Sequence, residues 1–319
     1  MKIFTKEQII GLLDTDLAVR RLEEGFIAFS NGKVQVPPTQ AFTFPQANGD
    51  CCIKSAHVAG SDTFTVKIST GFYDNPGKGL PSNDGLMMVV SATTGQPIAL
   101  LQDEGWLTCI RTALAGRIAA RILAPANVKA IGMLGTGTQA RMQLEQLAAV
   151  TPCRKVIAWG RSDFQLAAYK TFASGLGFEV EVTRDAEVVA RNANLIVCAT
   201  PSREPLLLSE WVQPGTHITA VGTDAPGKQE LDPALVARAD RIIVDALNQS
   251  SQYGEVSHAL NAGLIGEQQL TELGALLEGR VPGRDDDEQI TLVDLTGVAV
   301  QDAQISGCVL ASLNSQSTL

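Results

Sequence analysis

The spacing of hydrophobic residues divides the chain into stretches with different periods. Near the N-terminus, helical spacing predicts a short helix that starts after Thr5 and a longer one over about 16–30. Thr5 and Gln8 have the spacing of a capping box for the first helix. Residues 34–100 instead carry short β-type runs, such as 64–68 and 86–90, separated by Pro, Gly, Asn and Asp. This middle stretch predicts an antiparallel sheet with little helix.

From residue 108 onward, strand-like and helix-like segments alternate. A helix rich in Ala and Arg is predicted over 108–123, followed by a buried strand over 128–134 and a helix over 139–150. A further helix is predicted near 164–175, and further strands are predicted near 155–159, 179–182, 195–198, 217–221 and 241–244. Such alternation is typical of a doubly wound parallel sheet. The predicted fold class is therefore α/β, with a Rossmann-type parallel sheet and an α+β domain that contains the antiparallel sheet. Residues 290–319 add one strand and a final helix.

A G-x-G-x-x-A motif follows the predicted strand over 128–134 and opens the next helix. Its first glycine permits a tight turn, its second lets the backbone approach a pyrophosphate, and the small alanine lets the helix pack on the strand. The helix N-terminus adds free N–H groups and a favourable dipole for phosphate. The motif therefore predicts a dinucleotide site at Gly135, Thr136, Gly137, Thr138, Gln139 and Ala140. We also expect the cofactor to contact the ends of two later strands, at Ala199, Thr200, Val221 and Gly222.

The end of the strand over 155–159 bears on the choice of nucleotide. Enzymes that select NAD usually place an acid there for the ribose 2′-hydroxyl. This chain has Arg161 and Ser162 instead, whose guanidinium and hydroxyl could hold a 2′-phosphate. The alternative is that Arg161 is a solvated loop residue. We therefore predict a preference for NADP(H), with NAD(H) also possible.

Composition narrows the classes of partner. The chain has 319 residues, a net charge of -9 and a pI of about 4.9, which disfavours nucleic acid and anionic membranes as partners. Its length predicts two domains, and no apolar run is long enough to span a bilayer. The six cysteines show no metal-ligand spacing, so we expect reduced thiols, no metal site and a cytoplasmic protein.

Three polar residues stand among apolar neighbours. Lys67 lies inside the predicted strand over 65–68, Arg111 opens an Ala-rich helical segment, and Asp224 follows the strand over 217–221. Asp224 thus lies at the carboxyl end of a strand, where open α/β sheets bind ligands. Each also has a simpler interpretation. Lys67 could face outward on an edge strand, Arg111 could pair with a surface acid, and Asp224 could cap a turn.

The sequence resembles the ornithine cyclodeaminase and mu-crystallin family over nearly its whole length, and these three residues lie in segments that match. The segments that carry the resemblance are 66–67, 107–113, 135–140, 222–231 and 294–302. The resemblance implies a homodimer whose antiparallel domain forms the dimer interface and the substrate pocket. It also implies that the final helix returns to that domain. The expected domains are residues 1–117 with 300–319 for substrate binding and dimerisation, and residues 118–299 for the dinucleotide.

The resemblance also implies roles for individual residues. Arg111 would bind the substrate carboxylate, and Lys67 would polarise that carboxylate or the reacting C=N group. Asp224 would be the acid/base group that handles the proton near the nicotinamide, which suits a carboxylate beside an iminium. Thr112 and the loop at Gly297 would line the cofactor.

One segment departs from the family pattern. Members similar to cyclodeaminases often carry an arginine soon after the first prolines, whereas residues 36–41 of this chain contain none. This departure weakens the case for ornithine as the substrate. His57 could face the pocket instead, or it could be an ordinary strand histidine.

Four functions remain open on this basis. The first is an NAD(P)H-dependent reductase of a cyclic imino acid, such as pyrroline-2-carboxylate or piperideine-2-carboxylate. The second is an ornithine cyclodeaminase, which recycles its cofactor, and the third is an alanine-dehydrogenase-like enzyme that acts on an open-chain imino acid. The fourth is a binding protein similar to mu-crystallin that binds the dinucleotide with little turnover. Arg161 and Ser162, in place of an acid after the strand over 155–159, indicate NADPH and so favour the reductase. The presence of Lys67, Arg111 and Asp224 disfavours a purely structural role.

Overall fold

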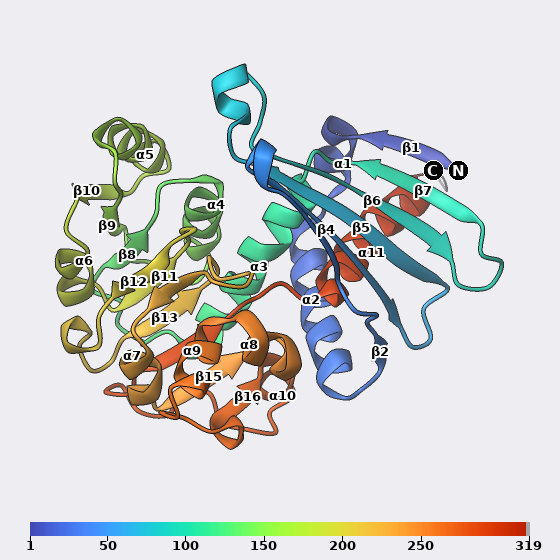
Figure 1. Ribbon diagram of the computed structural model, residues 1–319. Helices are drawn as coiled ribbons and strands as arrows, with labels where there is room; N and C mark the ends of the chain where they lie inside the picture. Colours follow the sequence, from blue (N-terminus) through green and yellow to red (C-terminus); the bar gives the residue numbers. More distant parts are fainter. Residues whose placement is uncertain (317–319) are drawn as a thin grey trace. The chain divides into compact units, whose positions relative to one another are not determined.

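The structure, a computed structural model, describes residues 1–316 and divides into two compact units (Figure 1). The first unit contains Met1–Arg111 and Val298–Leu319, and the second contains Thr112–Gly297. The boundaries predicted from the sequence lie a few residues further along, at 117 and 299. Residues 317–319, the end of the predicted substrate-binding domain, lie outside the described residues.

The first unit is built on a seven-stranded, mainly antiparallel sheet with the order β1-β7-β6-β5-β4-β2, in which β3 also pairs with β4. Its strands are β1 (Lys2–Thr5), β2 (Val34–Gln35), β3 (Gln40–Phe44), β4 (Gly49–Val58), β5 (Thr63–Phe72), β6 (Asn83–Ser91) and β7 (Pro97–Gln102). Its helices are α1 (Lys6–Leu12), α2 (Thr15–Ser30) and α11 (Ala299–Gln316). Helix α11 packs against α2, β4 and β5, so the two ends of the chain share one core (Figure 1).

The sequence prediction for this unit is confirmed in outline. The Gln8 side chain accepts a hydrogen bond from the Thr5 N–H at 2.9 Å, as in a capping box. The predicted position of Arg111 at a helix start is wrong, because helix α3 (Trp106–Leu123) begins five residues earlier. The cause is Asp103, whose carboxylate accepts from the Leu107 N–H at 2.7 Å and so satisfies the first turn of the helix.

The second unit is a doubly wound parallel sheet with the order β10-β9-β8-β11-β13-β17-β15-β16. Its strands are β8 (Ile131–Leu134), β9 (Lys155–Trp159), β10 (Glu179–Thr183), β11 (Leu195–Cys198), β13 (His217–Ala220), β15 (Arg241–Val244), β16 (Leu270–Glu272) and β17 (Thr291–Asp294). β12 (Arg203–Leu207) and β14 (Gln229–Leu231) form a separate pair. The helices are α4 (Thr138–Leu147), α5 (Asp163–Gly175), α6 (Ala186–Asn192), α7 (Pro233–Arg238), α8 (Leu247–Tyr253), α9 (Glu255–Asn261) and α10 (Leu273–Leu277).

The order of the parallel strands fixes where a ligand can bind. Starting from β8, the chain first adds β9 and β10 on one side and then crosses to add β11 and β13 on the other side. Ligands of open α/β sheets bind outside the carboxyl ends of the strands where this direction reverses. In this unit that point lies between β8 and β11.

The first strand of this sheet is shorter than predicted. The sequence predicts a strand over 128–134, whereas β8 begins at Ile131. The backbone N–H of Lys129 donates to the Asn194 side chain at 2.8 Å and so lies outside the ladder. All four residues of β8 are buried, which agrees with a central parallel strand.

Candidate functional site

The turn after β8 has the geometry that a dinucleotide pyrophosphate needs. Gly135 has φ +117, and a Cβ at this position would lie 2.7 Å from the carbonyl oxygen of Ala199 at the end of β11. Gly137 is the N-cap of α4, carries no side-chain cap, and has no atom within 4 Å of an added Cβ. The turn is therefore closed on the β11 side and open above the helix N-terminus. Ala140 is fully buried and lets α4 approach the sheet.

The structure places Arg161 and Ser162 in the turn between β9 and α5. Arg161 is exposed, so its guanidinium is accessible to a ligand. The Ser162 hydroxyl is the N-cap of α5 and accepts from the Gln165 N–H. Because this hydroxyl already has a structural role, the argument for a 2′-phosphate site depends mainly on Arg161.

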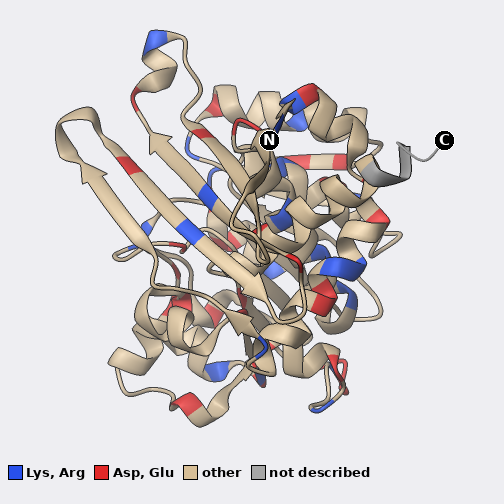
Figure 2. Cartoon of the chain, turned by 90° about the vertical axis from the view of Figure 1, so that its right-hand side faces the viewer, with Lys and Arg blue, Asp and Glu red and all other residues tan. Residues whose placement is uncertain are grey.

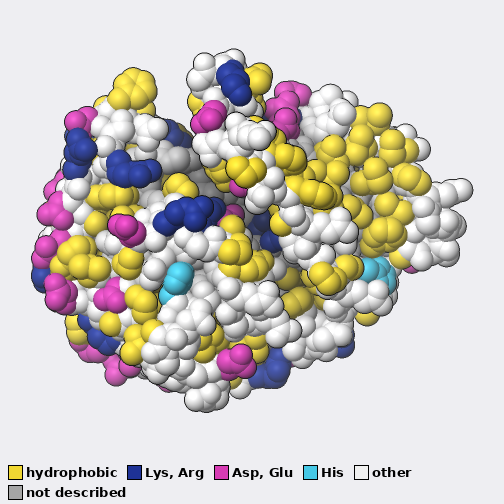
Figure 3. Space-filling model, viewed as in Figure 1, with side chains coloured by type: hydrophobic (Ala, Val, Ile, Leu, Met, Phe, Trp, Pro, Cys, Tyr) yellow, Lys and Arg dark blue, Asp and Glu magenta, His cyan; other side chains and the backbone are white. Residues whose placement is uncertain are grey.

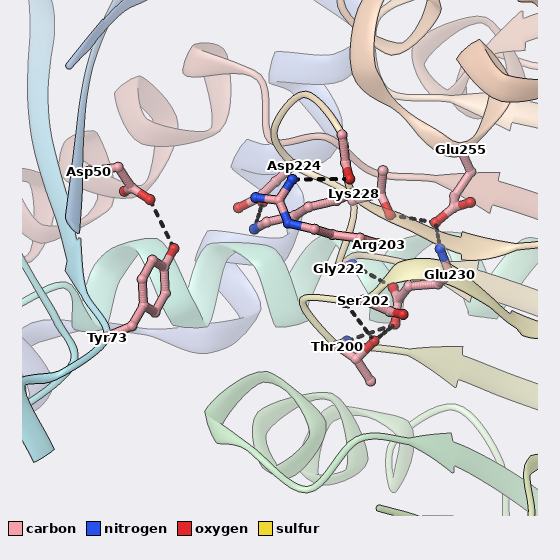
Figure 4. Close-up of polar contacts among 12 residues, drawn as sticks. Asp50, Tyr73, Thr200, Ser202, Arg203, Gly222, Asp224, Lys228, Glu230 and Glu255 are labelled. Atoms are coloured by element: carbon pink, nitrogen blue, oxygen red, sulfur yellow. Dashed lines mark hydrogen bonds and ion pairs between the residues drawn. The ribbon is translucent and has the colours of Figure 1, made fainter. Parts of the chain in front are cut away.

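The loops after β11 and β13 are joined by a buried carboxylate that the sequence analysis did not single out. Glu230 accepts from the Thr200 N–H and hydroxyl at 2.7 Å each, and from the Gly222 N–H at 3.0 Å (Figure 4). A Cβ on Gly222 would collide with Glu230 and with the Thr200 carbonyl, so this position requires glycine. Burial, with a smaller contribution from the neighbouring Glu255, raises the pKa of Glu230 to about 8. Glu230 thus fixes the two strand ends at which we expected cofactor contacts.

Glu255 supports the same loops from the other side. It accepts from the Glu230 and Leu231 N–H groups at 2.7 and 3.0 Å, and from the Thr223 hydroxyl (Figure 4). Burial raises the pKa of Glu255. Both acids could have been suspected from the sequence, because Glu230 lies in the 222–231 segment and Glu255 opens a helix. Their pairing depends on the fold.

Asp224 lies in the loop between β13 and β14, where its side chain is 55% exposed. It forms an ion pair with Lys228 at 2.5 Å, and the neighbouring Arg203 guanidinium donates to the Gly227 carbonyl at 3.4 Å (Figure 4). The carboxylate is therefore accessible and lies beside a cation, as an acid/base group at the surface of a site would be.

Three further predicted residues of this unit, Thr112, Gly297 and Val221, lie in separate places. The Thr112 carbonyl accepts from the Gln143 side chain at 3.2 Å, which connects α3 to α4. The Gly297 N–H donates to the buried Asp245 carboxylate at 2.7 Å, and Gly297 has φ +85. Val221 follows β13 directly and is buried.

The first unit contains a buried ionic cluster around Asp302. One carboxylate oxygen of Asp302 lies 2.9 Å from the Lys67 ammonium, and the other lies 3.2 Å from Nε of Arg111. The three side chains are 2%, 3% and 6% exposed respectively. Arg111 also donates through Nη1 to the Gln301 side chain at 3.1 Å. β5 lies between β4 and β6, so the alternative of an outward-facing lysine on an edge strand is wrong.

Positive charge exceeds negative charge in this cluster. Two cations, Lys67 and Arg111, face the single carboxylate of Asp302, and Lys54, the cross-strand neighbour of Lys67 on β4, is also buried. Figure 2 shows how few charged residues the strands of this sheet carry. Burial lowers the pKa of Lys67 to about 8, against the opposing effect of Asp302. Lys67 and Arg111 outweigh burial and hold the pKa of Asp302 below its usual value, while burial raises the pKa of Asp103 to about 6. Such a cluster favours an incoming anion.

Sequence reasoning found Lys67 and Arg111 but missed Asp302, Lys54 and Asp103. Asp302 lies in the 294–302 segment, 235 positions from Lys67, and no periodicity connects the two. His57 makes a local contact instead, since its Nε2 lies 3.0 Å from the Ser61 carbonyl in the same hairpin.

Comparison with known proteins identifies the family. The model of the ornithine cyclodeaminase/mu-crystallin family matches residues 2–317, so the chain belongs to this family. It is 37% identical to an alanine dehydrogenase of Archaeoglobus fulgidus, over 96% of this chain and 93% of that protein. It is 34% identical to an iminosuccinate reductase of Paracoccus denitrificans, over 97% of this chain and 96% of that protein.

Solved structures match the chain over its whole length. An archaeal alanine dehydrogenase dimer with bound NAD is 35% identical, with a TM-score of 0.90, and the match covers 99% of this chain and 97% of that one. A Δ1-pyrroline-2-carboxylate reductase of Thermococcus litoralis, in complex with NADH and L-proline, is 26% identical with a TM-score of 0.92, and the match covers 99% and 98%. These matches confirm the predicted fold class. Among the described residues, no helix is long and apolar enough to cross a membrane.

Proposed function

We propose that the chain is a nicotinamide-dependent reductase that converts the C=N bond of a small α-imino acid into an amine. The observation that carries the proposal is the buried cluster of Lys67 and Arg111, whose two positive charges exceed the single negative charge of Asp302. A substrate carboxylate would offset this excess. The named activities of the relatives, which are alanine dehydrogenase, iminosuccinate reductase and pyrroline-2-carboxylate reductase, support the same class of reaction.

The residues of the chain divide the chemistry between them. Lys67 and Arg111 bind the substrate carboxylate, and Asp224 gives the imine nitrogen its proton. The dinucleotide, when bound at the Gly135–Ala140 turn, supplies the hydride that the imine carbon accepts. A protonated nitrogen makes that carbon a better hydride acceptor, and a carboxylate next to it stabilises the iminium. One hydride and one proton thus convert the imine into the amine.

The proposed substrate is an imino acid with one α-carboxylate, and pyrroline-2-carboxylate is the first candidate. The open-chain imines that correspond to alanine and to aspartate are the next candidates, because relatives at 37% and 34% identity carry the matching names. The absence of an arginine in residues 36–41 favours net reduction over ornithine cyclisation.

For the cofactor, we propose NAD(H), with NADP(H) accepted through Arg161. Two solved relatives hold NAD or NADH. The predicted preference for NADP(H) stays a prediction that depends on one exposed arginine.

We also propose that the chain forms a homodimer through the antiparallel-sheet unit. Hydrophobic side chains gather on the outer surface of this unit (Figure 3). Alternate residues of β5 are buried against α11, while the others, such as Val66 and Ile68, are only half-buried. A solved relative with this fold is described as a dimer.

The test is an assay of nicotinamide absorbance with purified protein. NADH should be consumed when pyrroline-2-carboxylate, iminosuccinate or pyruvate with ammonia is added, and should stay constant without them. Lys67→Met should raise KM for the imino acid about tenfold or more, because it removes a charge-assisted contact to the carboxylate. The exposed Lys129→Met serves as the matched control. Ammonia release from ornithine without net NADH consumption would contradict the proposal, and so would inactivity with all three substrates.

A further inference from the structure

We propose that Asp302 is a positioning residue that holds Lys67 and Arg111 in the geometry that binds a substrate carboxylate. This inference deepens the proposed function and rests on it for the identity of the anion. Asp302 lies in the first turn of α11, Lys67 in the middle of β5 and Arg111 in α3. Three elements from distant parts of the chain therefore meet at one carboxylate.

The two oxygens of Asp302 contact different cations. Oδ2 lies 2.9 Å from Nζ of Lys67, and Oδ1 lies 3.2 Å from Nε of Arg111. A single planar group therefore sets the distance between the ammonium and the guanidinium. Gln301 adds a neutral acceptor for Nη1 of Arg111 at 3.1 Å, which fixes the rotation of the guanidinium.

Both cations keep hydrogen-bonding capacity beyond these contacts. An ammonium has three donors and a guanidinium has five. Asp302 and Gln301 occupy one donor of Lys67 and two of Arg111. The remaining donors can bind a second carboxylate beside Asp302, so the cluster suits a bound anion in addition to its own acid.

Without Asp302, the cluster would contain like charges close together in a site with little water. Arg111 and Lys54 both disfavour the protonated form of Lys67, and Asp302 is the main group that favours it. The titratable and charged groups that face Lys67 are Asp302, Arg111 and Lys54, with Asp103 near the same cluster. Asp302 thus acts both on the position and on the charge of the lysine.

The experiment measures binding of a non-reducible carboxylate, pyrrole-2-carboxylate, to the full chain by calorimetry over a range of pH. In the wild type, affinity should fall as pH rises through about 8, where Lys67 loses its proton. Asp302→Asn should weaken binding about tenfold and move this fall to lower pH, because the lysine loses the carboxylate that keeps it charged. The affinity for NADH should be unchanged.

Two further variants distinguish a specific role of Asp302 from general loosening of the core. Ser306→Ala removes the buried hydrogen bond of 2.7 Å between Ser306 and Thr65, which joins the same helix to the same strand without charge. Ser306→Ala should leave the affinity for pyrrole-2-carboxylate and its dependence on pH unchanged. Asp302→Glu keeps the charge but displaces it, so it should retain the alkaline fall and still weaken binding; it also serves if Asp302→Asn does not fold.

Wild-type affinity and an unmoved pH profile in both Asp302 variants would overturn the inference. An equal loss in Ser306→Ala would also overturn it, since it would indicate general loosening of the core. The binding measurement is independent of turnover. A wild type that binds the carboxylate but reduces no imino acid would refute the proposed function and leave the role of Asp302 testable.

Discussion

At the scale of single residues, the charged groups of the two units have opposite surroundings. Lys67 and Arg111 are buried and held by Asp302, whereas Asp224 is 55% exposed and forms an ion pair with Lys228. A buried cation suits a fixed anion site, because weak screening strengthens its attraction for a carboxylate. An exposed carboxylate suits proton exchange, because it can take up a proton from solvent after each turnover.

Asp224→Asn tests the assignment of the proton donor. The variant keeps the shape of the side chain but removes its acid/base function, so kcat should fall about 10²- to 10⁴-fold. The affinity for NADH, followed by its fluorescence, should stay within a factor of about two. Asp285→Asn, which removes a surface ion pair with Arg241, is the matched control. A kcat close to that of the wild type would discard the role of Asp224.

At the scale of elements, the turn between β9 and α5 is where we predict that the choice between NAD(H) and NADP(H) is made. Because Ser162 caps α5, Arg161 is the residue of the predicted pair that can bind a 2′-phosphate. Arg161→Ala should therefore raise the Kd of NADPH about tenfold and leave the Kd of NADH nearly unchanged. The exposed Arg191→Ala, in α6 and paired with Glu187 of the same helix, is the control. Equal losses for both nucleotides would remove the argument for 2′-phosphate recognition.

The elements also show what the sequence could predict. Local patterns predicted the helix over about 16–30, the strand runs over 64–68 and 86–90 and the turn at Gly135, because each depends on neighbours within a few positions. The start of α3 was predicted two residues late, at 108, because Asp103 caps the helix from outside the periodic segment. Strands β12, β14 and β16 were missed, because β12 and β14 form a separate pair and β16 lies at the sheet edge, so none carries the continuous buried apolar run of a central strand.

At the scale of the whole molecule, the sequence does not reveal which distant residues contact one another in the fold. The sequence singled out Lys67, Arg111 and Asp224 as separate residues and the family resemblance implied their roles, but only the fold joins Lys67 and Arg111 to Asp302. The same holds for Glu230, which joins the ends of β11 and β13. Side-chain contacts between segments 30 or more positions apart leave no periodic trace in a single sequence.

The central claim is that hydride passes from the nicotinamide to the imine carbon of an amino-acid precursor. The most direct test uses NADH with deuterium at the transferable position of C4 and the imino acid that gives the fastest turnover. The product amino acid should carry the deuterium at its α-carbon, as seen by mass spectrometry and NMR. Product without deuterium, or deuterium that stays with the nucleotide while ammonia is released, would contradict the account.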